Sequence, residues 1–216
     1  MGIKENYSGI QDKIPGARII AVSKYVNSEK IIEAYQAGIK DFGENKIQDA
    51  EKKRAELPEE INKNINWHFL GHLQTNKVKK VAGNYEYIHS VDSFKLAESL
   101  SKEASSKGIK QKILLQVNIA EEKTKYGFKI NEIKEIFKEI LNLESLEIIG
   151  LMTMAPFTKD RGLQKSVFKG LKDLRNYLET EYKVNIPELS MGMSNDYTTA
   201  CEEGSTMVRI GQAIFG

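Results

Sequence analysis

The 216-residue chain carries 32 lysine or arginine residues against 30 aspartate or glutamate residues, a formal net charge of +2. This balance provides no global basic field for nucleic acid or an anionic membrane, and no stretch approaches the roughly 18 apolar residues of a membrane helix. The single cysteine, Cys201, excludes an intramolecular disulfide framework and a thiolate metal cluster, and it fits a reducing cytosol. We therefore expect a cytoplasmic protein that uses neither nucleic acid nor a membrane, and whose partner is a small neutral or anionic ligand.

Short apolar runs rich in β-branched residues recur along the chain, and each is followed by a segment with helical periodicity. Eight of these runs predict strands, at Arg18–Ser23, Ile39–Phe42, Trp67–Leu70, Tyr87–Val91, Lys112–Asn118, Glu147–Met152, Glu188–Ser190 and Met207–Ile210.

Helices are predicted between these runs, because apolar residues recur there at three- and four-residue steps. The clearest covers Asn131–Leu141, and another begins at Ser93. Asn27 or Ser28 can cap a helix that Gly38 ends.

The segment after the second strand carries weaker signals. Asn45, with Gln48 three residues later, resembles a capping box, and Pro58 stops the helix that follows. We interpret the polar stretch Glu51–Asn66 as a mobile excursion.

The repeated alternation of strand and helix indicates a parallel sheet with right-handed crossovers, and eight units are what a closed (β/α)8 barrel requires. We predict one such barrel domain over residues 1–216. An open doubly wound sheet is the competing architecture. That fold favours a Gly-x-Gly-x-x-Gly turn after the first strand, where this chain has Ser23-Lys24-Tyr25-Val26.

Loops that follow the strands converge on one face of a barrel, so residues just past each run become neighbours. Lys24 ends the first run. Desolvation or a nearby cation can leave its amine neutral and able to form a Schiff base with the aldehyde of pyridoxal 5'-phosphate (PLP). The ordinary alternative is a lysine that keeps its charge in water at a strand end.

Two glycine-containing turns, after the seventh and eighth strands, form a candidate phosphate site. Ser194 can cap a helix that Gly204 ends, and the turn at Gly211 and Gln212 converges on the same place. Helix starts with free N–H groups bind phosphate, and barrels frequently place that site after strands seven and eight. A simple Ser N-cap beside a flexible turn is the alternative.

Arg209 lies in an otherwise apolar run, so burial of its guanidinium requires an acceptor. One interpretation is a structural salt bridge. The other is that the guanidinium faces the ring nitrogen of a bound cofactor, which would stay unprotonated because arginine keeps its own proton.

Two further patterns predict no function. His68 and His72 are four residues apart, but a strand followed by a loop does not align them and no Glu or Cys stands at ligand spacing, so we expect no metal site. The run Lys77–Lys80 has no interleaved aromatic residues and is interpreted as the solvated face of a short helix.

The chain also resembles the pyridoxal phosphate homeostasis protein family. The resemblance rests on words that occur in the same order over nearly the whole chain: Ala21–Lys24, Phe42–Asn45, Trp67–Lys77, Gly150–Met152, Leu189–Ser194 and Gly204–Gly211. It implies a barrel like the N-terminal domain of alanine racemase, with PLP linked covalently to Lys24. It further implies that Ser194 and the backbone at Gly211 and Gln212 meet the phosphate, that Arg209 approaches the pyridine nitrogen, and that Asn45 lines the ring pocket.

The resemblance implies storage or delivery of PLP to apo-enzymes, without established catalytic turnover and therefore without catalytic residues. A PLP-dependent amino-acid racemase is the alternative. Such enzymes need a second acid/base group on the opposite ring face, usually a tyrosine from a partner's extra β-domain, and this chain ends at its eighth strand. A third reading, a phosphate-binding barrel that forms no Schiff base, makes Lys24 incidental. No long apolar surface stripe demands a partner subunit, so we expect a monomer.

Overall fold

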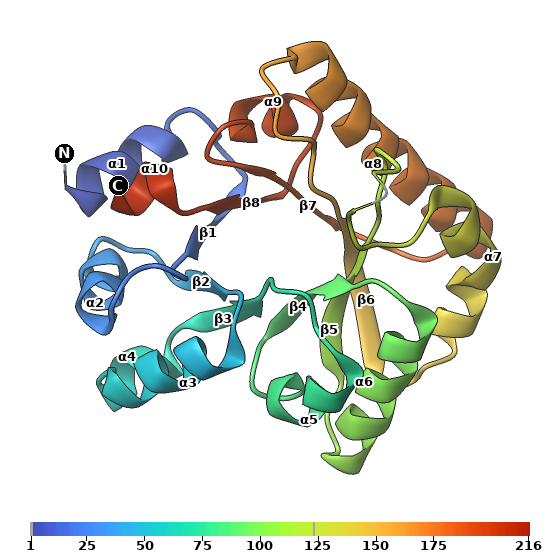
Figure 1. Cartoon of the computed structure of the whole chain (residues 1–216), viewed down its shortest axis with the longest axis horizontal. Helices are drawn as coiled ribbons and strands as arrows, with labels where there is room; N and C mark the ends of the chain where they lie inside the picture. The colour runs from blue at the N-terminus through green and yellow to red at the C-terminus, as the bar shows by residue number, and fades with distance from the viewer. Residues whose placement is uncertain (1, 123) are drawn as a thin grey trace.

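Eight parallel strands close into a barrel in the computed structural model, which describes residues 2–122 and 124–216. Neighbours in sequence pair in order around the barrel, and the last strand pairs with the first (Figure 1). The predicted (β/α)8 architecture is confirmed, and the open doubly wound sheet is excluded. The strands are β1 Arg18–Val22, β2 Asp41–Glu44, β3 Asn66–Phe69, β4 Tyr87–Val91, β5 Gln111–Gln116, β6 Leu146–Met152, β7 Glu188–Met193 and β8 Met207–Ile210.

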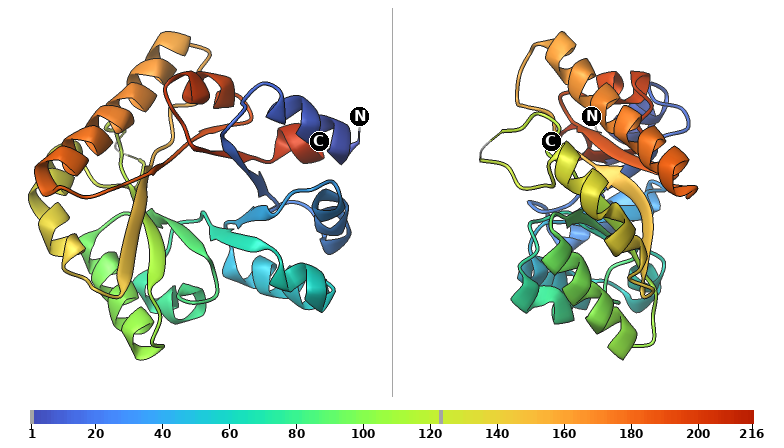
Figure 2. Two further views of the ribbon diagram at one scale, coloured as in Figure 1. Left: turned by 180° about the vertical axis from the view of Figure 1, so that it is seen from behind. Right: turned by 90° about the vertical axis from the view of Figure 1, so that its right-hand side faces the viewer.

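Helices form an outer ring around the barrel (Figures 1 and 2). The helical elements are α1 Ile3–Gln11, α2 Ser28–Gln36, α3 Ile47–Glu56, α4 Glu59–Lys63, the 3-10 turn η1 Thr75–Lys77, α5 Val78–Val81, α6 Phe94–Ser106, α7 Ile130–Leu141, α8 Arg161–Tyr182, α9 Tyr197–Glu202 and α10 Gln212–Phe215. Helices α1 and α10 lie side by side, and the Asn6 side-chain amide donates to the Ile214 carbonyl over 3.0 Å. Within the described residues, no helix is both long enough and apolar enough to cross a bilayer.

Alternation along the strands separates the barrel interior from the layer beneath the helices. On β1, Ile20 packs inside the barrel, together with Leu114, Ile149, Met152 and Met207 of other strands. Ile19 and Ala21 belong to the larger core between strands and helices. Residues two apart on a strand therefore share one environment.

Strand β2 begins two residues later than the sequence predicts. Gly38 adopts a φ of +102° after α2, and the Ile39 N–H donates to the Ala34 carbonyl over 3.1 Å. The buried Ile39 side chain thus completes the end of α2 rather than opening β2. The apolar residue at position 39 is therefore explained by burial at the end of a helix and not by the start of a strand.

Most of the segment Glu51–Asn66 lies in α3 and α4, so its interpretation as a mobile excursion is wrong. Helix α3 buries Ala50 and Lys53, and Leu57 and Ile65 pack into the main core. The predicted capping box is also wrong, because α3 begins at Ile47 and no side chain caps its first turn.

Candidate functional site

Lys24 and Asn45 follow the carboxyl ends of two neighbouring strands, β1 and β2. Val22 and Gly43 are the last paired residues of β1 and β2, and Lys24 and Asn45 each follow two residues later, in the turns that leave this end of the barrel. Lys24 is half-buried, and its amine lies 4.8 Å from the ring centre of Tyr25, whose side chain is exposed. The predicted nucleophile therefore stands where β1 opens onto the mouth of the barrel.

The turn after β8 lies directly against the end of β1. Ala21 pairs with Ile210, and a Cβ added to Gly211 would lie only 3.1 Å from the Val22 carbonyl oxygen. On the other side of Lys24, a Cβ added to Gly71 would lie 2.0 Å from the Asn45 carbonyl oxygen. Glycine at 71 thus lets the loop after β3 close onto the loop that carries Asn45.

The two predicted phosphate-binding turns meet, although the role expected of Ser194 as a helix cap is corrected. Helix α9 begins at Tyr197 after Asp196, whose carboxylate accepts from the Met193 N–H. The Ser194 hydroxyl instead accepts from the Ala213 N–H in the first turn of α10, over 3.4 Å. The short distance between the β7 and β8 turns places Ser194 beside Gly211 and Gln212.

Arg209 lies inside the barrel and is almost completely buried. Its guanidinium donates to the Ser190 hydroxyl over 2.6 Å and to the Thr153 carbonyl over 2.9 Å. Burial lowers the pKa of Arg209 to about 10, so the side chain stays protonated at neutral pH. Asp196 is the carboxylate whose charge acts on Arg209, but in residues 2–122 and 124–216 no carboxylate oxygen lies within 4.0 Å of the guanidinium, which excludes a direct salt bridge. A buried cation held by neutral acceptors, with N–H groups to spare, suits an uncharged ring nitrogen.

A buried ion pair fixes the backbone immediately before Lys24, and sequence reasoning missed it. Glu44 faces outward from the barrel, where its Oε1 accepts from the Lys53 amine over 2.7 Å and from the Ser23 hydroxyl over 2.6 Å. Lys53 also donates to the Ser23 carbonyl over 2.7 Å. The second Glu44 oxygen is buried without a partner among the described protein atoms. The sequence feature that could have indicated this ion pair is Lys53, a lysine on the buried face of α3.

We expect Lys53→Met to lower the free energy of unfolding by about 3 kcal/mol, because it leaves the Glu44 carboxylate buried and uncompensated. Urea denaturation measures this loss. The matched control is Lys52→Met on the exposed side of α3, which should stay near the wild-type value. Adding Glu44→Gln to Lys53→Met should restore part of the stability. A double variant no more stable than Lys53→Met would show that the orphaned charge is not the cause.

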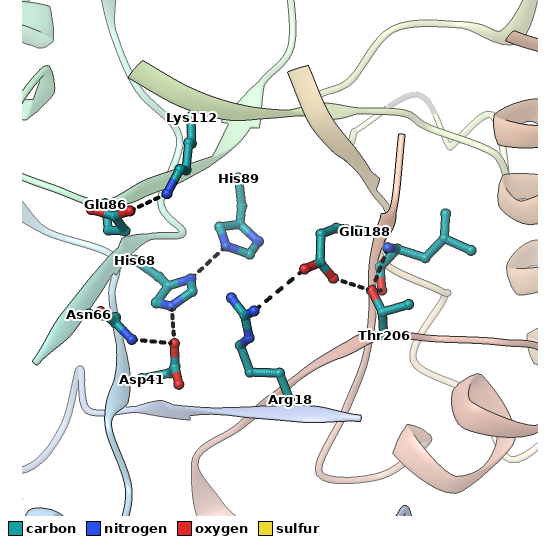
Figure 3. A network of polar contacts seen from close by, with 10 residues as sticks. Arg18, Asp41, Asn66, His68, Glu86, His89, Lys112, Glu188 and Thr206 are labelled. Carbon is teal, nitrogen blue, oxygen red and sulfur yellow. Dashed lines mark hydrogen bonds and ion pairs between the residues drawn. The ribbon is translucent and has the colours of Figure 1, made fainter. Parts of the chain in front are cut away.

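His68 and His72 lie in different environments. His68 is fully buried, its Nδ1 lies 2.9 Å from Nε2 of His89, and its Nε2 lies 3.0 Å from Oδ1 of Asp41 (Figure 3). His72 is exposed, bonds Asp92 over 3.0 Å and stacks on Tyr126 with the ring centres 3.7 Å apart. Among the residues that the structure describes, no group of three or more His, Cys, Asp or Glu side chains is placed to hold a metal ion.

Burial favours the neutral form of both buried histidines. Burial lowers the pKa of His68 from its usual 6.5 in spite of the Asp41 carboxylate. Burial lowers the pKa of His89 further, and the nearby His68, Arg209 and Arg18 add to the shift. Other groups at this end of the barrel are Tyr87, which stacks on His68, and Glu86, which forms an ion pair with Lys112 (Figure 3).

These shifts predict loss of stability in acid. The unfolded chain takes up a proton at each histidine near pH 6.5, whereas the folded protein resists it, so stability is complete above pH 6.5 and falls as the pH is lowered toward the folded pKa values. The slope should reach about 1.4 kcal/mol per pH unit for each histidine. Urea titrations between pH 7 and pH 5 measure it. His89→Asn should show a smaller slope, and an unchanged slope in that variant would contradict the assignment.

Comparison with known proteins identifies the family. Residues 2–216 match the family model described as alanine racemase, N-terminal domain. A pyridoxal phosphate homeostasis protein of Aquifex aeolicus (strain VF5) is 42% identical over 93% of this chain and 86% of its own length. The chain belongs to the pyridoxal phosphate homeostasis protein family.

Other members of the pyridoxal phosphate homeostasis protein family agree. One from Synechocystis sp. is 39% identical over 94% of this chain and 92% of its own. The structure of PipY from Synechococcus elongatus with PLP bound superimposes with a TM-score of 0.91 at 35% identity, covering 99% of this chain and 100% of PipY. Alanine racemase of Clostridium difficile has a TM-score of 0.82 at 17% identity, and this chain covers 56% of it, so that likeness concerns the fold alone.

Proposed function

We propose that this protein binds PLP at the carboxyl mouth of its barrel and serves intracellular PLP homeostasis by storing and delivering the cofactor. The observation that carries this proposal is Arg209, a buried guanidinium with no carboxylate in contact among the described residues, close to the turn that meets the end of β1. Membership of the pyridoxal phosphate homeostasis protein family and the PLP-bound structure of PipY support it.

The residues at the mouth fit the three chemical parts of PLP. Lys24 would hold the aldehyde end of PLP through its amine, as a Schiff base formed with release of one water. Ser194, with the backbone at Gly211 and Gln212, would hold the phosphate at the start of α10, where the turns after β7 and β8 meet. Arg209 donates toward the pyridine nitrogen. When bound, PLP supplies an electron-withdrawing ring, which an arginine beside its nitrogen weakens relative to an acid there.

Asn45 lines the ring pocket in this proposal. The loop at Gly71 approaches its backbone carbonyl closely, and Asn45 follows β2, the neighbour of the strand that precedes Lys24. Lys24, Asn45, Ser194, Arg209, Gly211 and Gln212 thus come from three strand ends, β1, β2 and β8, and the turn after β7.

We further propose that residues 1–216 act as one PLP-binding domain, as a cytoplasmic monomer that passes PLP to apo-enzymes without catalytic turnover. No residue in this scheme is placed as a second acid/base group for racemisation. The single cysteine fits a reducing cytosol.

The test is a transfer assay in which the PLP-loaded protein is mixed with an apo-enzyme acceptor, alongside a racemase assay on several amino acids. We expect the acceptor to gain activity and no amino acid to lose optical rotation. Racemisation at a rate that depends on Lys24 would contradict the carrier function in favour of an enzyme. A protein that binds no PLP would contradict the binding site itself.

A further inference from the structure

A chain of buried hydrogen bonds runs through the barrel from Arg209 to Asp41 at the opposite end. The Arg209 Nη1 donates to Ser190 Oγ over 2.6 Å, and Ser190 Oγ lies 2.9 Å from His89 Nδ1. His89 Nε2 lies 2.9 Å from His68 Nδ1, and His68 Nε2 lies 3.0 Å from Asp41 Oδ1. The chain joins β8, β7, β4, β3 and β2, and Figure 3 shows its end at Asp41.

Only one arrangement of protons satisfies this chain when both imidazoles are neutral. The Asp41 carboxylate accepts only, so His68 carries its proton on Nε2 and its Nδ1 must accept from His89 Nε2–H. His89 Nδ1 is then an acceptor, and the Ser190 hydroxyl must donate to it. The Ser190 oxygen is left to accept from Arg209, which can only donate. Every proton therefore points from Arg209 toward Asp41.

The arrangement also explains how Arg209 is held without a carboxylate beside it. Asp196 acts on the guanidinium from a distance, and Asp41 accepts at the far end of the chain, where two neutral rings and a hydroxyl connect it to Arg209 through polarised hydrogen bonds. A carboxylate in direct contact would take the N–H groups of Arg209 and would place a negative charge near the ring nitrogen. Thr153, from the end of β6, supplies the other neutral acceptor.

We propose that Asp41, His68, His89 and Ser190 form a positioning network that fixes the orientation of Arg209 toward the cofactor. This role rests on the proposed PLP site, because Arg209 acts there. The four residues touch no cofactor in this proposal. They act through Arg209, and the most distant, Asp41, lies at the amino end of β2.

The first test needs no cofactor. Nitrogen-15 NMR of the apo-protein at neutral pH distinguishes the two tautomers of each ring, and the chain has only three histidines to assign. We expect both His68 and His89 to be neutral with the proton on Nε2. A proton on Nδ1 of either ring, or a cationic ring, would overturn the network whatever the protein does with PLP.

The second test compares variants of the PLP-loaded protein by the rate of PLP release and the position of the visible absorbance band. Ser190→Ala removes the hydroxyl that accepts from Arg209, and His89→Gln removes the ring nitrogen that orients this hydroxyl. For both variants we expect PLP release about tenfold faster or more, with a shifted absorbance band. His89→Asn restores an oxygen near the position of Nδ1, so it should release PLP more slowly than His89→Gln. Glu86→Gln removes a charge at the same end of the barrel outside the chain and should behave as wild type.

These outcomes separate the two proposals. Wild-type protein that fails to bind PLP overturns the proposed function, while the NMR result still decides whether the network exists. Wild-type protein that binds PLP, with folded Ser190→Ala and His89→Gln variants that release it at the wild-type rate, overturns the positioning role alone.

Discussion

Lys24→Ala should abolish the adduct between PLP and the protein that borohydride reduces. In the proposed site the amine of Lys24, which follows β1 at the mouth of the barrel, is the nucleophile, so its removal leaves only the proposed phosphate and ring contacts. We expect the variant to lose the visible absorbance of the Schiff base and to retain only weak, dialysable PLP. Absorbance spectra before and after borohydride treatment measure both.

Lys40→Ala is the matched control for this variant. Lys40 is exposed and also lies over a tyrosine ring, 3.4 Å from the centre of Tyr35, but it precedes β2 at the opposite end of the barrel. It should keep the full adduct. A reducible adduct that persists in Lys24→Ala would move the attachment to another lysine.

Arg209→Ala should keep the Schiff base but release PLP about ten- to a hundredfold faster. A hydrogen bond from a charged donor contributes about 1.5–3 kcal/mol, and the variant also leaves the Ser190 hydroxyl and the Thr153 carbonyl without their donor. Stopped-flow transfer of PLP to an excess of acceptor measures the release rate.

The control for Arg209 is Arg161→Ala. Arg161 is exposed at the start of α8, where it bonds Thr199 and Glu202. Its loss should leave PLP release unchanged. A release rate for Arg209→Ala equal to that of wild type would reject the contact between Arg209 and the cofactor.

The eight strands could be predicted because each is a short apolar run between turns, and closure of the barrel follows from counting them. Their ends are less predictable. Ile39 is as apolar as a strand residue but completes the end of α2. The sequence neighbours of Ser194 predict a helix cap, whereas its hydroxyl accepts from the Ala213 N–H in another turn. Contacts between loops carry no local signal.

The polar interior shows the same limit. His68 and His89 stand in apolar runs, which marks them as unusual, but their pairing depends on which face of each strand they occupy. A shift of one residue in the assumed alternation of inward and outward side chains would place them outside the barrel. Lys53 and Glu44 are likewise nine residues apart in sequence and meet only because α3 folds back over β2.

Peptide mapping of the wild-type protein after loading with PLP and reduction with borohydride tests the central claim most directly. Mass spectrometry should find a pyridoxyl group on the peptide that contains Lys24 and on no other peptide. A pyridoxyl group on a different lysine, or protein that remains unmodified, would contradict the account.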